Sequence, residues 1–216
     1  MNAAFFDVDG TLVDSMADIA ATVNHTRRQF GLCEIPVSEV AKHVGLGARH
    51  LLVHSIPEMA EEGDRLWDAF RSHYAEHSLD NVAPYPGVIE TLETLKSKGW
   101  LLGINTAKPN FAVKAILEHL GMTDFFGDAV IAGGDCPEMK PSPLPLKMCA
   151  EKAGHKLTPC DWMVGDNWTD VECAKNAGVK GAFCAFGFGV LKETSTYDAR
   201  LDCMTDLLKF TVDGAK

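Results

Sequence analysis

The sequence predicts an α/β fold, because short apolar runs alternate along the chain with amphipathic segments of helical length. A second observation is the interval from about Ser15 to Asn81, which contains several amphipathic helices and no convincing strand. At about 150 residues per domain, the length of 216 residues allows one domain, or one domain with a sizeable insertion. Together these observations predict a parallel sheet that is covered by helices on both faces and interrupted by an all-helical insertion.

Nearly continuous apolar runs are the predicted strands, since a parallel strand in such a sheet is buried on both faces. The first run covers residues 3–8 and ends at Asp9-Gly10, where a glycine lets the chain turn. The later runs are residues 101–105, 129–132, 162–165 and 181–186. Sheets of this type bind ligands outside the carboxyl ends of their strands, so functional residues are expected there.

The predicted helices are identified by apolar spacing and by the glycines that follow them. In the core, Gly99, Gly121 and Gly178 each stand where a left-handed helix cap is expected. One helical face of the insertion is apolar and is interpreted as core rather than as a ligand site; it contains Leu66, Trp67, Phe70 and Tyr74. A PYPG turn at residues 84–87 returns the chain from the insertion to the main domain.

Composition excludes several classes of protein. A hydrophobic content of 46% is too high for a disordered chain, and the net charge of −10 argues against a basic nucleic-acid-binding surface. The seven cysteines include no CxxC pair, which favours neither a disulfide framework nor a structural zinc site and fits a reducing cytosol. Without a signal-like start or an apolar run of membrane length, we expect a cytoplasmic protein with no membrane partner.

Carboxylates follow two of the predicted strands. Asp7 and Asp9 lie in DVDGT at the end of the first, and alone this pattern is equally typical of a turn with a solvated acid. In GDNWTD, Asp166 follows another strand and Asp170 enters the next helix. If these acids meet at one sheet edge, each pair at 4 Å costs about 4 kcal/mol at an effective dielectric near 20. Such a cluster requires a cation, and its oxygen ligands suit Mg²⁺.

Two further residues suit a phosphate group. Thr106 ends the strand LGINT and offers a hydroxyl beside free backbone N–H groups, although a threonine before a helix is more often a simple cap. Lys140 lies in MKPSPLPL among three prolines, which hold its ammonium group in place. Each signal is weak or moderate by itself.

Taken in order, DVDGT at Asp7, the strand end at Thr106, Lys140 before a proline and GDNWTD at Asp166 resemble the four motifs of the haloacid dehalogenase superfamily. FGFG at 186–189 and the helical insertion resemble its phosphoglycolate phosphatase-like branch. The resemblance implies a Rossmann-like, doubly wound core of residues 1–14 and 83–216. A helical cap of residues 15–82 would be inserted after the first strand.

The resemblance also implies residue roles. Asp7 would be the nucleophile that forms an aspartyl-phosphate, and Asp9 would be the general acid and then the general base. The carboxylates of Asp7 and Asp166 and the backbone carbonyl of Asp9 would hold Mg²⁺, with Asp170 supporting the site. The hydroxyl of Thr106, the backbone N–H of Ala107 and the ammonium of Lys140 would hold the phosphoryl oxygens. The family often has asparagine and lysine after the threonine, whereas this chain has Ala107 and Lys108.

The expected activity is a Mg²⁺-dependent phosphatase acting on a small anionic phosphorylated metabolite, with 2-phosphoglycolate as the leading candidate. A pyrophosphatase, a nucleotidase, a sugar-phosphate phosphatase or mutase, and a non-catalytic phosphate-binding protein remain alternatives. Asp9 argues against a dehalogenase or a phosphonate hydrolase, which usually lack an acid there. We expect a monomer or a homodimer.

The insertion contains candidates for substrate selection. Arg49 in VGLGARHLL would bind a substrate carboxylate, with a solvated arginine as the equally weighted alternative and His43 as a weaker candidate. Six of the eight histidines lie in the insertion, and the pairs His50/His54 and His73/His77 have i, i+4 spacing. No third ligand is apparent beside either pair, so both are interpreted as solvated helix faces.

Overall fold

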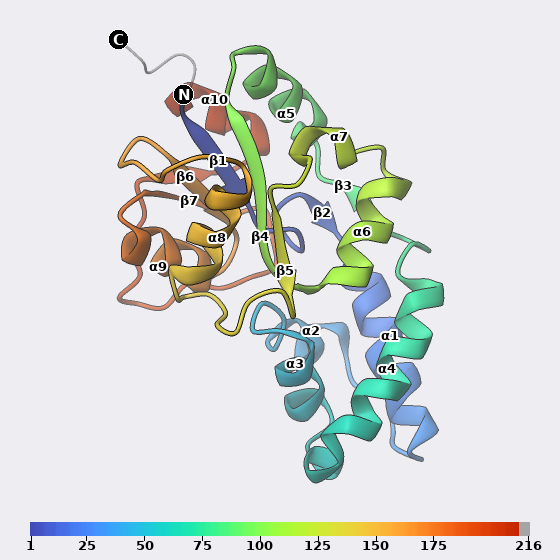
Figure 1. Cartoon of the computed structure of the whole chain (residues 1–216). Helices are drawn as coiled ribbons and strands as arrows, with labels where there is room; N and C mark the ends of the chain where they lie inside the picture. The colour runs from blue at the N-terminus through green and yellow to red at the C-terminus, as the bar shows by residue number, and fades with distance from the viewer. Residues whose placement is uncertain (212–216) are drawn as a thin grey trace.

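The core is a six-stranded sheet whose strands run parallel in the order β5-β4-β1-β6-β7-β8 (Figure 1). The structure, a computed structural model, describes residues 1–211. The strands are β1 (Ala3–Phe6), β4 (Leu101–Pro109), β5 (Val130–Gly133), β6 (Trp162–Gly165), β7 (Lys180–Cys184) and β8 (Ala199–Leu201). In register, Phe6 of β1 lies beside Ile104 of β4 and Val164 of β6. The residues that follow these strands therefore emerge at the same edge of the sheet.

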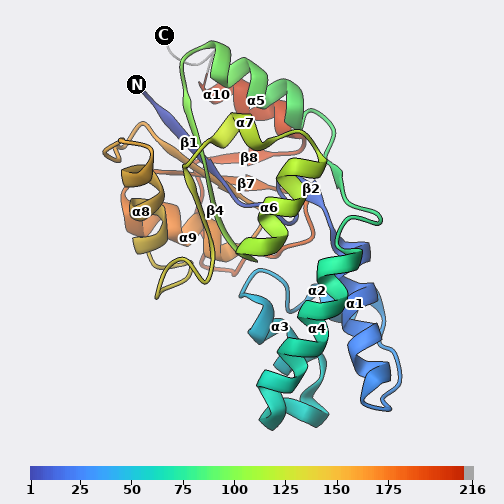
Figure 2. The same ribbon diagram turned by 45° about the vertical axis from the view of Figure 1, so that its right-hand side comes forward.

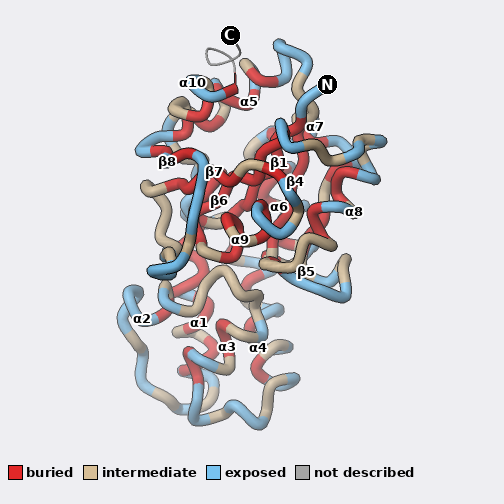
Figure 3. The backbone as a smooth tube through the Cα atoms, turned by 90° about the vertical axis from the view of Figure 1, so that its left-hand side faces the viewer, coloured by how far each residue is buried: buried red, intermediate tan, exposed pale blue. Residues whose placement is uncertain are grey.

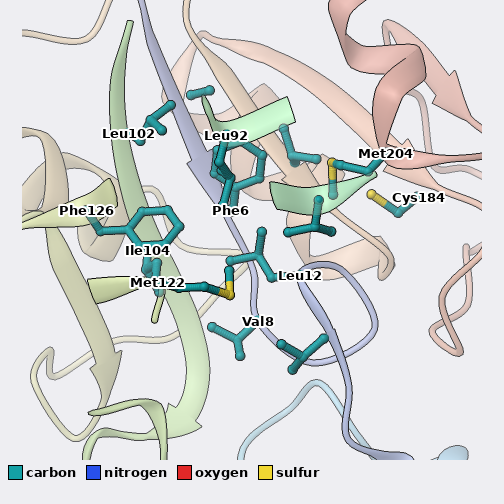
Figure 4. Close-up of a cluster of buried hydrophobic side chains, with 14 of the residues drawn as sticks. Phe6, Val8, Leu12, Leu92, Leu102, Ile104, Met122, Phe126, Cys184 and Met204 are labelled. Atoms are coloured by element: carbon teal, nitrogen blue, oxygen red, sulfur yellow. The ribbon is translucent and has the colours of Figure 1, made fainter. Parts of the chain in front are cut away.

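Helices cover both faces of this sheet, as the sequence predicts. They are α5 (Val88–Ser97), α6 (Asn110–His119), α7 (Thr123–Phe126), α8 (Leu144–Lys152), α9 (Trp168–Ala177) and α10 (Leu207–Thr211), with a 3-10 turn η2 at Met204–Asp206. Alternate residues of β1 point to opposite faces, so Phe6 joins one buried cluster and Phe5 the other. The Phe6 cluster continues through Leu92 and Ile104 (Figure 4). The predicted doubly wound α/β class is confirmed.

The helical cap lies beyond the carboxyl edge of the sheet (Figure 2). It consists of α1 (Met16–Gln29), α2 (Val37–Ala41), α3 (Ala48–Ser55), the 3-10 helix η1 (Pro57–Glu62) and α4 (Gly63–His77). A buried cluster of its own includes Ile19, Val23, Leu66 and Phe70 and also takes in Ala112 of α6. The burial colours accordingly show a large buried interior in the core and a smaller one among the cap helices (Figure 3). None of the described helices has the length and apolar character needed to span a bilayer.

The sequence analysis did not predict three short strands. Two of them, β2 (Val13–Asp14) and β3 (Ala83–Pro84), pair antiparallel where the chain leaves the core and returns to it. The third is β8 at the sheet edge, where a three-residue strand leaves no recognisable apolar run. The pairing of β2 with β3 ties together the two segments that connect cap and core.

Candidate active site

Three carboxylates from distant parts of the chain meet at the carboxyl edge of the sheet. Asp7 follows β1, Asp166 follows β6, and Asp170 lies in the first turn of α9. One carboxylate oxygen of each lies within 4.8 Å of those of the other two, and all three residues are buried. The backbone N–H of Asp7 donates to the carbonyl of Val164 at 2.9 Å, which continues the sheet pairing into the site. The predicted meeting of acidic side chains is therefore present.

Asp166 is enclosed by backbone. Its Oδ2 accepts hydrogen bonds from the N–H groups of Phe188 at 3.0 Å and Gly189 at 2.7 Å. A Cβ on Gly10 would lie 1.9 Å from the same oxygen, and Gly10 has a φ of +76°. Glycine is thus required at the turn after Asp9 for both space and backbone conformation. The FGFG segment and the DVDG turn together fix the orientation of Asp166.

Lys140 and Asp170 form a buried ion pair beside the nucleophile candidate. Lys140 Nζ lies 2.6 Å from Asp170 Oδ1, 2.9 Å from the carbonyl oxygen of Asn105 and 3.1 Å from Asp7 Oδ1. The other oxygen of Asp170 accepts the N–H of Asn167 at 3.0 Å, as part of the capping box of α9. Both oxygens of Asp170 are therefore engaged: Oδ1 holds the Lys140 ammonium, and Oδ2 holds the N–H of Asn167.

The charges of this cluster are not balanced by protein groups. Burial, followed by the neighbouring Asp170 and Asp7, raises the pKa of Asp166 well above its ordinary value. Burial disfavours the charge of Lys140, but Asp170 and Asp7 outweigh it and raise its pKa. Asp7 Oδ1 is buried and makes no hydrogen bond of good geometry, although it lies near Lys140. An oxygen-only donor set, in which one buried carboxylate oxygen makes no hydrogen bond, fits a hard divalent cation such as Mg²⁺.

Asp9 is held by residues that sequence reasoning missed. Its Oδ1 accepts hydrogen bonds from Lys108 Nζ at 2.7 Å and from the hydroxyl of Ser15. The same Lys108 ammonium lies 2.6 Å from the hydroxyl of Tyr74 on cap helix α4. Lys108 lies two residues after Thr106 at the carboxyl end of β4, and both residues are buried. That spacing was the available signal for Lys108.

Tyr74 belongs to the cap core, as predicted, and also contacts the candidate site. Its ring packs in the cap core, with its centroid 5.1 Å from that of Phe70, as the apolar spacing predicts. Its hydroxyl, however, reaches the site, so the interpretation of this helix face as core alone is incomplete. Burial raises the pKa of Tyr74 to about 12, against the opposing effect of Lys108. The contact is thus made by a neutral phenol and a charged ammonium, since Asp9 and Tyr74 outweigh burial and raise the pKa of Lys108.

A pocket between cap and core joins these groups. The core supplies Asp7, Asp9, Thr106, Ala107 and Lys108 to its wall. The cap supplies a mainly apolar and glycine-containing surface of Ile19, Val44, Gly45, Gly47, Ala48, Leu51, Phe70 and Tyr74. The nucleophile and acid–base candidates therefore line one small pocket.

Arg49 lies outside this pocket. Its guanidinium pairs with Asp64 at 2.8 Å, and 63% of its side chain is exposed. It lines a neighbouring groove with His50, Trp67 and Arg71, beside Ala107 and Pro109. Its predicted contact with a substrate carboxylate stays a prediction, and it would require the side chain to leave Asp64.

A sequence profile of the family described as Haloacid dehalogenase-like hydrolase matches residues 4–184. The chain belongs to this family. The hydrolase is 35% identical to a phosphoglycolate phosphatase of Aquifex aeolicus, over 97% of this chain and 96% of that one. It is 36% identical to a phosphoglycolate phosphatase of Neisseria meningitidis, over 92% of this chain and 86% of that one. The resemblance based on the four motifs is confirmed, including the phosphoglycolate phosphatase-like branch.

Solved structures agree with the fold of this hydrolase. The crystal structure of a predicted phosphoglycolate phosphatase from Haemophilus somnus superposes with a TM-score of 0.89 at 30% identity and covers 98% of both chains. A predicted phosphatase from Clostridium acetobutylicum superposes with a TM-score of 0.86 at 24% identity, over 98% of both chains. The second likeness shows the fold alone.

Proposed function

We propose that this hydrolase is a Mg²⁺-dependent phosphatase that cleaves a small phosphate monoester, with 2-phosphoglycolate as the leading substrate. The observation that carries the proposal is the shared pocket of Asp7 and Asp9, with Lys140 beside Asp7 and Lys108 on Asp9. The relatives named phosphoglycolate phosphatase support the choice of substrate. The substrate assignment is the part that experiment must establish.

The first half-reaction assigns one role to each of two carboxylates. An oxygen of Asp7 attacks phosphorus in line with the ester bond, and the electron pair of that bond leaves with the alkoxide oxygen. Asp9, protonated at this stage, gives its proton to the leaving oxygen, so the alcohol departs neutral. Asp7 then carries the phosphoryl group as an acyl phosphate.

The second half-reaction restores both carboxylates. Asp9, now ionised, takes a proton from a water molecule whose oxygen attacks phosphorus. The bond between phosphorus and the Asp7 oxygen breaks, inorganic phosphate leaves, and Asp9 is protonated for the next cycle. Lys108 and Ser15 hold Asp9 Oδ1, so the other oxygen is the one that exchanges the proton.

Charge neutralisation completes the proposal. The Lys140 ammonium, the Thr106 hydroxyl and the Ala107 N–H would hold the phosphoryl oxygens as negative charge develops on them. Asp7, Asp166 and the Asp9 carbonyl would bind Mg²⁺, which supplies Lewis-acid charge neutralisation when bound. Asp170 supports the site by fixing Lys140.

We infer that residues 15–82 act as a lid on a core of residues 1–14 and 83–216. The paired strands β2 and β3 lie at the two crossings between these parts. A closed cap would exclude bulk water from phosphoryl transfer, and an open cap would admit substrate and release product. The cap wall of the pocket is mainly apolar and includes the small residues Gly45, Gly47 and Ala48. A cytoplasmic location and a monomeric or homodimeric state stay predictions.

A substrate panel tests the proposal. Phosphate release is measured with Mg²⁺ for 2-phosphoglycolate, hexose phosphates, nucleoside monophosphates and pyrophosphate. The highest kcat/KM is expected for 2-phosphoglycolate, and activity should disappear with a chelator and return with Mg²⁺. A clear preference for hexose phosphates or pyrophosphate would overturn the substrate assignment, and no hydrolysis of any ester would favour a binding protein.

A further inference from the structure

Three cap histidines form a closed cluster that the sequence does not reveal. His50 and His54 lie one turn apart on α3, and His43 lies in the turn that follows α2. Their ring centroids are separated by 3.8 Å for His50 and His54, 5.4 Å for His43 and His54, and 6.4 Å for His43 and His50. Each ring therefore adjoins both of the others. His43 is thus a third histidine beside the i, i+4 pair His50/His54, for which the sequence showed no third ligand.

The separations of 5.4 and 6.4 Å that involve His43 are near those of a metal-binding set, whereas the stacked pair His50/His54 is closer at 3.8 Å. With Zn–N bonds of about 2.1 Å, imidazole centroids around a tetrahedral ion lie roughly 5 Å apart. Among the described residues, only Asp7, Asp166 and Asp170 have ligand atoms already within 4.8 Å of one another. The rings of His43 and His50 must consequently turn for their nitrogens to converge with Nε2 of His54. His54 is exposed and the other two are half-buried, so the surface leaves room for that rotation.

A hydrogen bond of His54 leaves its Nε2 free to bind a metal ion. Its Nδ1 lies 2.9 Å from the carbonyl oxygen of His50. A carbonyl only accepts, so Nδ1 carries the proton and Nε2 keeps its lone pair, which is the usual arrangement of a metal-bound histidine. Burial, followed by the nearby His54, also lowers the pKa of His43 and of His50, so these rings are neutral near pH 7.

A second histidine cluster in the cap provides an internal contrast. His73 stacks with His25 at 3.9 Å and with His77 at 4.3 Å. No ring contact joins His25 and His77, so these three described rings do not each adjoin both of the others as the rings of His43, His50 and His54 do. His77 Nδ1 is moreover paired with Asp80 Oδ2 at 2.9 Å. The two clusters thus share composition and helical spacing but differ in geometry.

We propose that His43, His50 and His54 form a binding site for a transition metal ion of the imidazole-binding class, with Zn²⁺ as the ion. The site goes beyond the proposed phosphatase activity and does not rest on it. Val44, Gly45, Gly47 and Ala48, which lie between His43 and His50 in sequence, line the catalytic pocket. Bound Zn²⁺ therefore fixes the cap loop that faces the substrate.

The test measures binding of Zn²⁺ and of its spectroscopic substitute Co²⁺ to the full chain, with Mg²⁺ in excess to occupy the acidic cluster. We expect one ion per chain and a cobalt d–d spectrum of imidazole ligation without a thiolate charge-transfer band. The variants His43→Ala, His50→Ala and His54→Ala should each weaken binding by roughly tenfold or more. Because His54 is exposed, its variant should retain the circular dichroism spectrum of the parent.

Matched controls come from the linear cluster and from the acidic site. His77→Ala removes a histidine of the same helical spacing, and Asp166→Asn removes a carboxylate of the magnesium site; both should bind Zn²⁺ as the parent does. Binding lost equally in His77→Ala, binding lost in Asp166→Asn, or a thiolate band would overturn the proposal. So would affinity unchanged by all three substitutions in the His43 cluster.

Discussion

The carboxyl edge of the sheet and the inner face of the cap contribute to the same pocket in different ways. At the sheet edge, charged groups are buried and fixed by backbone: Asp166 by loop N–H groups, Asp170 by the start of α9, and Lys140 by a strand carbonyl. The cap contributes an apolar wall and one hydroxyl, that of Tyr74. The comparison indicates that the core supplies the charged groups of the candidate site, whereas the cap lines the pocket and contacts Lys108 through Tyr74.

The two buried lysines differ in the same way, because one contacts the core alone and the other contacts both core and cap. Lys140 contacts core groups only, at Asp7, Asp170 and Asn105. Lys108 bridges the core residue Asp9 and the cap residue Tyr74. Removing a core contact should therefore abolish chemistry, while removing the cap contact should weaken it.

The largest effect is expected for Lys140→Met. Loss of the ammonium leaves Asp170 and Asp7 uncompensated and removes a partner of the phosphoryl oxygens, so kcat should fall by about 10²- to 10³-fold. Breaking the buried pair should also lower the free energy of unfolding by about 3 kcal/mol. Steady-state kinetics and urea unfolding measure both. Lys147→Met on the exposed side of α8 is the control, and equal behaviour of the two variants would contradict the role of Lys140.

A smaller effect is expected for Gly10→Ala, which tests the enclosure of Asp166. The new Cβ would meet Asp166 Oδ2 at 1.9 Å, so the carboxylate must move and kcat should fall by about 10²-fold. Gly31→Ala is a matched control, because Gly31 has a similar φ of +72° with nothing within 4 Å. The control should lose about 1 to 2 kcal/mol of stability from backbone strain and keep its activity. Equal kinetics for the two variants would show that Asp166 is not held as described.

Tyr74→Phe tests the contribution of the cap. The ring remains in the cap core, while the Lys108 ammonium loses a partner, so kcat should fall by about tenfold with a loss of about 1 kcal/mol of stability. Tyr197→Phe, at an exposed tyrosine, should change neither quantity. Comparison of kcat and KM separates the roles, since a wall residue changes KM and a residue that positions Asp9 changes kcat. Unchanged kcat would remove Tyr74 from the positioning of Asp9.

The smallest effect concerns the pH dependence of cap stability. Burial, followed by His25 and His77, lowers the folded-state pKa of His73 below the unfolded value of 6.5, with Arg28 acting in the same direction and Glu76 against it. The unfolded chain therefore binds more protons below about pH 6.5, and stability falls as the pH falls through that value. Thermal unfolding between about pH 7.5 and 5.5 should show this slope, and His73→Gln should reduce it, leaving the part that His43 and His50 contribute. His119→Gln on α6 is the control, and a slope unchanged by His73→Gln would contradict the prediction.

Prediction from sequence succeeded where each element carries its own signal. The strands around β1 are buried on both faces and therefore read as apolar runs, and the acids that follow them mark the sheet edge. Lys108 was missed as a site residue because its position depends on where β4 ends. Its contact with Tyr74, 34 residues earlier in the sequence, has no local sequence signal. His43 was missed as a partner of His54 because the two lie in different elements. The strands β2 and β3 contain two residues each, which is too short for a periodic pattern.

The central claim is that Asp7 forms a covalent phosphoryl intermediate within the acidic cluster. Rapid acid quench of the enzyme during turnover, followed by peptide mass spectrometry, tests this most directly. With an aryl phosphate, whose leaving group departs without a proton, the Asp9→Asn variant should accumulate the intermediate because it lacks the general base for its hydrolysis. We predict the added mass of one phosphoryl group on Asp7 and on no other residue. A phosphoryl group on another side chain, or unchanged turnover by Asp7→Asn, would contradict the account.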